Sequence, residues 1–570
     1  MTVYGNKIFK NPIEIITAFN SLDVQKAFEK IEKLKEKYFL TGYCRYEMRH
    51  VFEDGNFSFA KPLLYFEVYE NFEEFLPDTK TLPEKIRLNP IPTIDFENYA
   101  KAIEKIKQAI ANGNTYEVNY TLDFNVEYEG DSLKLFEYLL QKQPTPYNAF
   151  FENEFDTILS FSPELFFELE KSKITTRPMK GTIRRGRTNE EDLKNIEFLK
   201  NDVKNRAENV MIVDLLRNDL GRIAKTGSVK VEKLFEIETH STLHQMTSKI
   251  TAEIREEVSL YDIFKSIFPC GSITGAPKVS TMKIIDEIEK GNRNIYCGAI
   301  GFLSPEKCIF SVPIRILQRE TCEKTTYKYR AGGAIVWDST TTEEWDEVLT
   351  KSKFLLPDFK LVETMRVENG KILFEKEHFE RLSKSAEFFG FPAPSKTDFR
   401  CEKNSSESPE KLSEKRAENF EFERLNDGIL RILYSKDGNF EHEFRELKPN
   451  LTNKIIFSDL PVQSRNIFLY HKTDFKPWFE GAYEKIRKGE VFDVIFFNEK
   501  GEITEGARSN IIIQKGGKLF TPPVSSGRLD GIYLNSMENI FTKILYKNDL
   551  ENADKIFCVN SVRGCVEVEF

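Results

Sequence analysis

The stretch Ile174-Thr-Thr-Arg-Pro-Met-Lys-Gly-Thr-Ile-Arg-Arg-Gly186 places a single lysine directly after a strand-like run. The strand is expected to end at Arg177-Pro178, and Lys180 is expected to lie on the turn that follows, with Gly181 behind it. An amine that is held on a glycine-containing turn beside other cations has a lowered pKa and can act as a nucleophile. A lysine in an arbitrary basic loop is usually a solvated surface residue, so the residues around Lys180 decide its meaning.

The length and composition of the chain set the outer limits of the prediction. Its 570 residues are too many for one hydrophobic core, so two or more domains are expected. The formal net charge of −9 argues against nucleic acid or an anionic membrane as the main partner. No apolar run reaches the length of a membrane span, the first residues do not resemble a signal peptide, and the eight cysteines form no Cys-x-x-Cys pair. We therefore expect a cytoplasmic protein with reduced thiols.

The pattern along the chain predicts two domains, residues 1–355 and 356–570. In the first domain, apolar residues at helical spacing predict helices near 103–112 and 190–212, a further helix is expected from Glu343 to about Leu355, and much of the remaining sequence is strand-like. A new architecture begins with a strand and turn at Leu361–Gly370. The charged, serine-rich stretch 401–418 is expected to be a surface insertion in the second domain.

The residues around Lys180 resemble the Pro-Ile-Lys-Gly-Thr signature of aminodeoxychorismate synthase component I, in the chorismate-binding family. Anthranilate synthases of that family carry alanine at the position of Lys180. The resemblance covers roughly residues 90–355 and continues through Arg206–Gly221, Pro269–Lys278 and Tyr329–Val336. It implies a mixed α and β fold (α+β / α/β), with a large antiparallel β-sandwich, flanking helices and a site for chorismate.

The resemblance also implies roles for individual residues of the first domain. Lys180 would be the nucleophile, and Glu164, in Ser162-Pro-Glu-Leu-Phe166, would protonate the leaving hydroxyl group as a general acid. Glu208 would be a magnesium ligand. Its partners would be Glu344 and Glu347, which are three residues apart and share one helix face, with Glu347 favoured for direct ligation.

Six further residues are expected to bind the substrate: Thr274, Gly275, Lys278, Arg315, Gly332 and Gly333. Glycines allow close backbone approach, and free amides at the start of the helix expected near Pro277 favour an anion. Chorismate carries two carboxylates, and Arg315 is a candidate for a bidentate clamp on one of them.

Two positions depart from the pattern of the chorismate-binding family. Gln245 stands where the family usually has histidine, and the histidine of this chain, His244, lies one residue earlier. Glu117 stands where ammonia-using synthases usually have glutamine. Two roles remain open for Glu117, to orient ammonia or to deprotonate ammonium.

Residues from about 357 to 570 resemble the fold-type IV pyridoxal-phosphate enzymes, which include aminodeoxychorismate lyase and aminotransferases and have two subdomains. Lys472, in His471-Lys-Thr473, would carry pyridoxal 5′-phosphate, and Glu505 would face its pyridine nitrogen. Arg381 and two backbone amides would bind the phosphate. The cofactor-binding candidates are Arg381, Lys472, Glu505, Ile532 and Tyr533. Asp474-Phe475-Lys476 replaces the usual Thr-Asn-Arg after the lysine.

Together the two resemblances imply a bifunctional enzyme of folate precursor synthesis. The first domain would aminate chorismate to 4-amino-4-deoxychorismate with Mg²⁺, and the second would eliminate pyruvate to give 4-aminobenzoate. No cysteine lies in a glutaminase-like setting, so ammonia is expected from a separate glutamine amidotransferase subunit. Two alternatives for the function remain open: an anthranilate or isochorismate synthase joined to an aminotransferase, and a protein in which one half is a non-catalytic module. A homodimer through the second domain also remains open.

Overall fold

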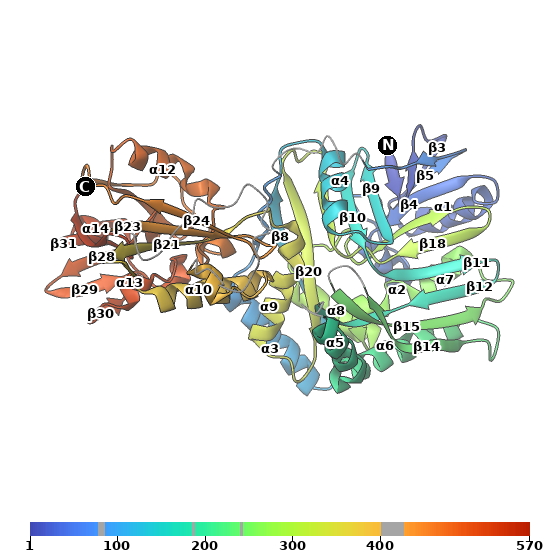
Figure 1. Ribbon diagram of the computed structural model, residues 1–570. Helices are drawn as coiled ribbons and strands as arrows, with labels where there is room; N and C mark the ends of the chain where they lie inside the picture. Colours follow the sequence, from blue (N-terminus) through green and yellow to red (C-terminus); the bar gives the residue numbers. More distant parts are fainter. Residues whose placement is uncertain (78–85, 185–188, 240–242, 401–426) are drawn as a thin grey trace, which may run out of the picture. The chain divides into compact units, whose positions relative to one another are not determined.

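The computed structural model describes residues 1–77, 86–184, 189–239, 243–400 and 427–570. These residues form two compact units, Met1–Pro357 and Asp358–Phe570 (Figure 1). The expected surface insertion at 401–418 lies outside the described residues. No helix among the described ranges is both long and apolar enough to cross a membrane.

Two large antiparallel sheets form the frame of the first unit. In order across the first sheet, the strands are β16 (Gly275–Ala276), β8 (Glu117–Glu127), β20 (Thr326–Ile335), β19 (Ile316–Glu320), β10 (Asp156–Ser162), β9 (Tyr147–Glu152), β1 (Thr2–Tyr4), β2 (Lys7–Phe9) and β6 (Glu73–Glu74), with β7 (Ile91–Pro92) beside β8. In the second sheet they are β13 (Met179–Arg184), β15 (Leu243–Glu253), β12 (Lys173–Arg177), β11 (Leu165–Glu170), β18 (Lys307–Ser311), β17 (Ala299–Leu303), β4 (Phe39–Cys44), β5 (Leu64–Tyr69) and β3 (Glu14–Ala18), with β14 (Lys230–Thr239) beside β15. The predicted antiparallel framework is confirmed.

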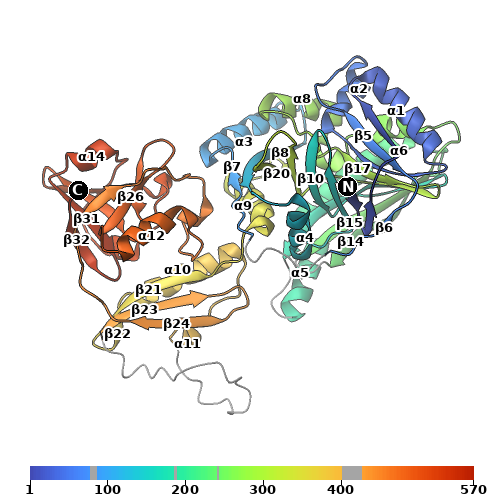
Figure 2. The ribbon, with the colours of Figure 1, turned by 90° about the horizontal axis from the view of Figure 1, so that it is seen from above.

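Helices flank these sheets. They are α1 (Ser21–Leu34), α2 (Arg49–Asp54), α3 (Phe96–Ala111), α4 (Ser132–Lys142), α5 (Asn189–Asn201), α6 (Val203–Gly221), α7 (Leu260–Ile267), α8 (Lys278–Ile288) and α9 (Thr341–Ser352). The region near 190–212 holds two helices, because Asp202 interrupts it and its carboxylate accepts the Asn205 amide as the N-cap of α6. Helix α9 packs on β20, and α3 packs on α9 (Figure 2).

Aromatic side chains dominate the core of the first unit. Phe264 of α7 contacts the rings of Phe28, Phe167 and Phe310 at centroid distances of 5.0, 5.6 and 5.0 Å. These rings come from α1, β11 and β18, so one residue ties two helices to the second sheet. Every residue of β5 is buried, which explains why its sequence is not a simple alternation of polar and apolar residues.

The second unit has two parts. The first contains the antiparallel sheet β22 (Lys371–Ile372), β21 (Leu361–Glu368), β23 (Gly428–Tyr434) and β24 (Phe440–Arg445), with α10 (Glu375–Phe389) and α11 (Lys396–Phe399). The second contains β25 (Ile455–Phe457), β26 (Asp493–Phe497), β27 (Ile503–Gly506), β30 (Ile540–Thr542), β29 (Lys518–Thr521), β28 (Asn510–Lys515), β31 (Lys555–Asn560) and β32 (Gly564–Val568), with α12 (Glu480–Arg487), α13 (Ile532–Asn535) and α14 (Lys547–Glu551). This arrangement agrees with the predicted two-subdomain fold.

Candidate active sites

Lys180 and Glu117 join the two sheets of the first unit. Lys180 lies on β13 and Glu117 at the start of β8, and the lysine Nζ donates a 2.6 Å hydrogen bond to Glu117 Oε1. Both side chains are buried, with exposed fractions of 9% for Lys180 and 0% for Glu117. The pairing of β13 with β15 shifts between Met179 and Thr182, and Gly181 has a φ of +89°. This bulge bends β13 next to Lys180 and so changes the direction of the side chains there.

The position and the pKa expected for Lys180 both need correction. The lysine lies within a strand rather than on a turn, and its neighbours are carboxylates rather than cations. Burial favours the neutral amine, but Glu117, Glu208 and Glu164 outweigh burial and raise the pKa of Lys180 above its ordinary value. These carboxylates therefore favour the protonated form of the Lys180 amine.

Glu164 lies where the chain crosses from β10 to β11, that is, from one sheet to the other. Its carboxylate is buried, and Ser272 Oγ donates to its Oε1 at 2.6 Å. Burial raises the pKa of Glu164 to about 7, although Ser272 and Lys180 act in the opposite direction. A carboxyl group that keeps its proton near neutrality can serve as a general acid. Sequence reasoning gave Ser272 no role, although it lies within the Gly-Ser-Ile-Thr-Gly motif.

Three further glutamates lie near this pair on α6 and α9. A Cβ atom at Gly333 of β20 would lie 3.1 Å from Glu344 Oε2 and 3.3 Å from Glu347 Oε1, so both carboxylates lie against the backbone at this glycine. Burial, together with Glu117 and Glu347, raises the pKa of Glu208 to about 6 against the effect of Lys180. Within the described ranges, no three His, Cys, Asp or Glu side chains are grouped closely enough to hold a metal ion by themselves.

The two glutamates of α9 each have one oxygen engaged. Glu344 Oε1 accepts from Ser339 Oγ at 2.6 Å, and Glu347 Oε1 accepts from Lys351 Nζ at 2.6 Å. Lys351 lowers the pKa of Glu347, whereas burial raises that of Glu344. Glu347 therefore carries its negative charge more readily, which is the property that a cation ligand needs.

The loop Pro269–Lys278 lies beside the start of β8, because its strand β16 pairs with Glu117 and Val118. Gly275 has a φ of +136°, and a Cβ atom there would lie 2.0 Å from the Glu117 carbonyl oxygen, so this position requires glycine. Thr274 is buried, and its hydroxyl group donates within the loop. Helix α8 begins at Lys278, as expected, but Lys278 Nζ donates to Asp219 at 2.8 Å and to two carbonyl oxygens, so it holds the loop in place.

Arg315 and Gly332 complete the predicted substrate-binding set. Burial lowers the pKa of Arg315, and Tyr329 acts in the opposite direction. A half-buried cation of this kind is suited to an anionic ligand. A Cβ atom at Gly332 would lie 1.9 Å from the Tyr120 carbonyl oxygen, so this glycine permits close contact between β20 and β8.

Gln245 and His244 lie side by side on β15 and therefore point to opposite faces of the sheet. Gln245 pairs with Thr182 of β13, and its Oε1 is buried without a hydrogen bond. The His244 ring lies 2.8 Å from Asp192 Oδ1 and 3.0 Å from Thr239 Oγ1. His244 is therefore engaged on the other face and does not replace the histidine that the family usually has at the position of Gln245.

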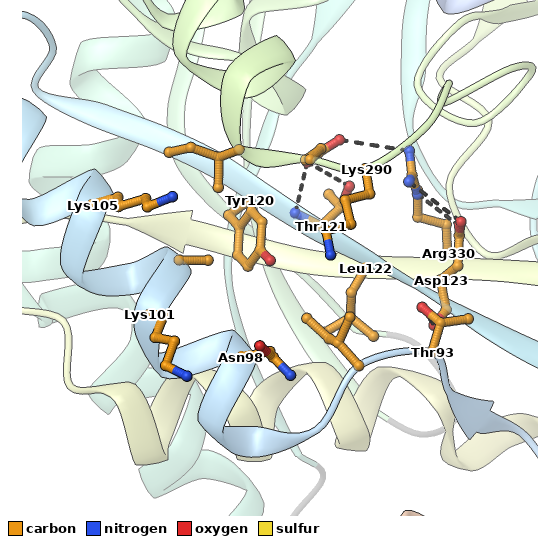
Figure 3. Close-up of a pocket in the computed structure, with 14 residues that line it drawn as sticks. Thr93, Asn98, Lys101, Lys105, Tyr120, Thr121, Leu122, Asp123, Lys290 and Arg330 are labelled. Atoms are coloured by element: carbon orange, nitrogen blue, oxygen red, sulfur yellow. Dashed lines mark hydrogen bonds and ion pairs between the residues drawn. The ribbon is translucent and has the colours of Figure 1, made fainter.

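A pocket beside α3 and β8 lies apart from these residues, and none of the predicted site residues lines it (Figure 3). Basic side chains surround it, among them Lys101, Lys105, Lys290 and Arg330. Figure 3 shows the Lys101 and Lys105 side chains reaching toward it from α3, opposite Arg330.

The wall of this pocket supports the loop of the first site. Glu289 accepts from the Thr121 amide at 2.9 Å and from Arg293 Nη2 at 2.7 Å. Arg293 in turn donates to the carbonyl oxygens of Ile273 and Asn119 at 2.9 and 2.8 Å. These buried and charge-assisted bonds fix Pro269–Lys278 against β8.

In the second unit, Arg381 of α10 is held by Glu363 of β21. Arg381 donates to both carboxylate oxygens, at 2.9 and 2.6 Å, and His378 Nδ1 lies 2.6 Å from Oε2. Although burial opposes it, Arg381 and His378 hold the pKa of Glu363 down to about 2. The sequence motif contained Glu363 and His378, but their function as the support of Arg381 appears only in the fold.

Lys472 and Glu505 face the same charged region of the second unit. The Lys472 carbonyl oxygen accepts the Val362 amide at 2.9 Å, which fixes the segment beside β21. Burial and the Arg381 cation lower the pKa of Lys472 to about 8. Burial raises the pKa of Glu505 to about 7, while the Lys476 cation opposes the rise. Lys476 is itself buried, and burial lowers its pKa.

The remaining cofactor-binding candidates, Ile532 and Tyr533, begin the short helix α13 after its N-cap Gly531. Amides in the first turn of a helix have no acceptor within that helix, so they are available to a phosphate group. Asn510 was not predicted. Its Nδ2 donates to the Leu529 carbonyl oxygen at 3.0 Å and lies 3.5 Å from Glu505 Oε2, so it links this segment to Glu505.

Both units match models of known protein families. The family model of chorismate binding enzymes matches residues 67–357, which is half of the chain. The chain belongs to this family. A second model, amino-transferase class IV, matches residues 360–569. Both resemblances predicted from the sequence are thereby confirmed.

Known proteins are similar to part of this chain. The chain is 42% identical to aminodeoxychorismate synthase component 1 of Escherichia coli K12 over 46% of its own length and 57% of that protein. It is 36% identical to anthranilate synthase component 1 of Aquifex aeolicus over 48% and 55%. The chain thus spans little more than half the length of these relatives. The crystal structure of anthranilate synthase component I from Streptococcus pneumoniae covers 62% of this chain and 92% of its own, with a TM-score of 0.54 and 24% identity, and shows the same fold.

Proposed function

We propose that residues 1–355 convert chorismate and ammonia into 4-amino-4-deoxychorismate and that residues 356–570 release pyruvate from this product to give 4-aminobenzoate. The observation that carries the proposal is a buried lysine, Lys180, set between the carboxylates of Glu117 and Glu164. Anthranilate synthases carry alanine at this position, so a lysine here favours amination at C4 through a covalent intermediate over direct amination at C2.

In the first reaction, the Lys180 amine adds to C2 of the ring while Glu164 protonates the C4 hydroxyl group, which leaves as water. Ammonia then adds at C4 and expels Lys180. The covalent step divides one difficult substitution into two easier ones. Arg315 and the backbone at Gly275 and Gly332 would hold the carboxylates of the substrate.

The carboxylates near Gly333 fit a magnesium ion. Burial raises the pKa of Glu208 to about 6, and the carboxylates of Glu117 and Glu347 add to the rise, so a divalent cation would relieve this repulsion. Mg²⁺ requires few protein carboxylates and keeps several waters, so two or three glutamates and a substrate carboxylate suffice. When bound, the ion would neutralise charge and orient the substrate.

The second unit fits pyridoxal 5′-phosphate. Lys472 has a lowered pKa suited to covalent attachment, Glu505 is a buried carboxyl group for the pyridine nitrogen, and Arg381 with the α13 amides suits the phosphate. When bound, the cofactor supplies an electron sink. Lys472 would take the proton from C4 of the substrate and later return a proton to the enolpyruvyl carbon.

Product analysis tests this proposal directly. Purified protein is incubated with chorismate, ammonium and Mg²⁺, with pyridoxal phosphate added, and the products are identified by liquid chromatography and mass spectrometry. We expect 4-aminobenzoate and pyruvate in equal amounts. Anthranilate or isochorismate as the main product would overturn the assignment of the first unit, and accumulated aminodeoxychorismate without 4-aminobenzoate would overturn that of the second.

Ammonia is proposed to come from a separate glutamine amidotransferase subunit. The relatives named component 1 are parts of multi-component enzymes, and free ammonia is a small fraction of total ammonium at neutral pH. The chain alone should therefore work with ammonium salts but not with glutamine. Turnover with glutamine as the sole nitrogen source, without an added subunit, would contradict this.

A further inference from the structure

The Glu117 carboxylate is fully buried, and only one of its oxygens has a partner. Oε1 accepts the 2.6 Å hydrogen bond from Lys180 Nζ, whereas Oε2 is buried and accepts no hydrogen bond from the described residues. Leaving a buried polar atom unpaired costs about 1–3 kcal/mol, and more for a charged group. Because this unpaired oxygen does not stabilise the fold, its place beside the candidate nucleophile indicates that Glu117 has a function in the reaction.

The charges around Lys180 create a chemical problem for its proposed role. Glu117 of β8, which is hydrogen-bonded to Nζ, and Glu164 between β10 and β11 favour the protonated amine, and Glu208 of α6 does so while no cation neutralises it. Glu347 and Lys204 act in turn on Glu208. A protonated amine has no lone pair for attack, so a nearby group has to accept the proton. In the described part of the structure, the acceptor of the Nζ hydrogen bond is Glu117.

We infer that Glu117 is the proton acceptor that frees the Lys180 amine for attack, rather than a residue that only orients ammonia. This inference rests on the proposed amination of chorismate. One proton passes from Nζ to Glu117, the N–C2 bond forms, both ring double bonds shift, and the C4–O bond breaks as Glu164 gives its proton to the departing hydroxyl group, which leaves as water. The proton passes along the existing Nζ–Oε1 hydrogen bond, so Glu117 holds it on Oε1.

The second half of the cycle returns each proton to its starting point. Ammonium gives one proton to the Glu164 carboxylate, and the resulting ammonia adds at C4. The N–C2 bond then breaks, and Lys180 leaves as a neutral amine. Lys180 takes back the proton that Glu117 holds, which restores the protonated lysine and the Glu117 carboxylate. Glu117 and Glu164 thus act on different protons.

The experiment follows formation of the covalent adduct alone, without ammonium. Full-length protein, Glu117→Gln and Glu117→Asp are mixed with chorismate and Mg²⁺ between pH 7 and 9, and the adduct of chorismate minus water is timed by intact-mass spectrometry. Glu127→Gln, at the exposed end of the same strand, is the matched control. Melting curves identify variants that fail to fold.

We expect Glu117→Gln to form the adduct about 10²–10⁴-fold more slowly at pH 7. Its rate relative to the unchanged protein should rise about tenfold per pH unit, because Lys180 then has to lose its proton to solvent. Glu117→Asp keeps a base, so its relative rate should not change with pH. A pH-independent ratio for Glu117→Gln would overturn this inference alone, whereas 4-aminobenzoate formation without any adduct in the unchanged protein would overturn the covalent route and this inference with it.

Discussion

Burial changes the chemistry of single carboxyl groups in both units. Glu164 and Glu505 are both buried, and burial raises the pKa of each to about 7. At neutral pH such groups exchange protons readily, whereas an exposed glutamate stays ionised. This is the property that a general acid or a partner of a pyridine nitrogen requires.

The pKa of Glu164 predicts the pH dependence of the first reaction. The active form of a general acid is protonated and lies below its pKa, so the rate of amination should fall about tenfold per pH unit above about pH 7. The measurement is the turnover rate from pH 6 to 9, with total ammonium adjusted to keep free ammonia constant and saturating. The Glu164→Gln variant should react about 10²–10⁴-fold more slowly, and its rate should no longer fall above about pH 7. If the rate of the variant still fell above about pH 7, the fall would belong to another titrating group.

Lys180→Ala tests the nucleophile. The variant should lose the covalent route, because no other amine is placed to attack C2. Its rate of aminodeoxychorismate formation should fall by a factor of at least about 10³. Any residual direct amination would favour C2 and yield anthranilate, which chromatography distinguishes. Unchanged aminodeoxychorismate formation would rule out Lys180 as the nucleophile.

Helices α6 and α9 each contribute a candidate ligand, so the magnesium site depends on how two elements meet. Glu208→Gln and Glu347→Gln should each raise the Mg²⁺ concentration needed for half-maximal activity by about tenfold or more, because each removes one ligand charge. Glu343→Gln, on the exposed face of α9, is the control and should behave like the unchanged protein. Unaltered Mg²⁺ dependence in both test variants would show that the ligands lie elsewhere.

Strand β21 and helix α10 are joined by the contacts of Glu363 with Arg381 and His378. The pKa of Glu363, about 2, lies below the ordinary value of 4.5. Its contribution to stability is therefore complete above about pH 4.5 and is lost as the pH falls toward 2. Glu363→Gln should lower the free energy of unfolding by about 3–5 kcal/mol at pH 7, and by less at pH 3.

Urea denaturation at the two pH values provides the measurement for Glu363. Glu441→Gln, an exposed substitution in the same unit, should stay within about 0.5 kcal/mol of the unchanged protein. An equal loss of stability at pH 3 and pH 7 would mean that the charge of Glu363 is not what matters.

At the scale of the whole molecule, the two reactions use residues from separate units. Lys472→Ala should lose the visible absorption band of bound cofactor and 4-aminobenzoate formation, while aminodeoxychorismate accumulates at the rate of the unchanged protein. Absorption spectra and product analysis of the same sample check both parts. A retained band would assign cofactor attachment to another lysine, with Lys476 the nearest candidate in sequence.

The sequence by itself determined the features that depend on local residue order. Apolar spacing predicted α3, and ordered motifs indicated both families and selected Lys180, Glu164 and Lys472. Such features can be predicted without the tertiary structure, because neighbours along the chain remain neighbours in a helix or strand.

Only the tertiary structure decided the electrostatics of the sites. Glu117 and Lys180 are 63 residues apart in sequence but share a 2.6 Å hydrogen bond between two sheets. The sequence placed Lys180 among the arginines that follow it and predicted a lowered pKa, whereas the fold surrounds it with carboxylates from β8, α6 and the β10–β11 crossing, and the prediction was wrong. A pKa depends on burial and on charges within a few ångströms, and the packing of distant segments determines both.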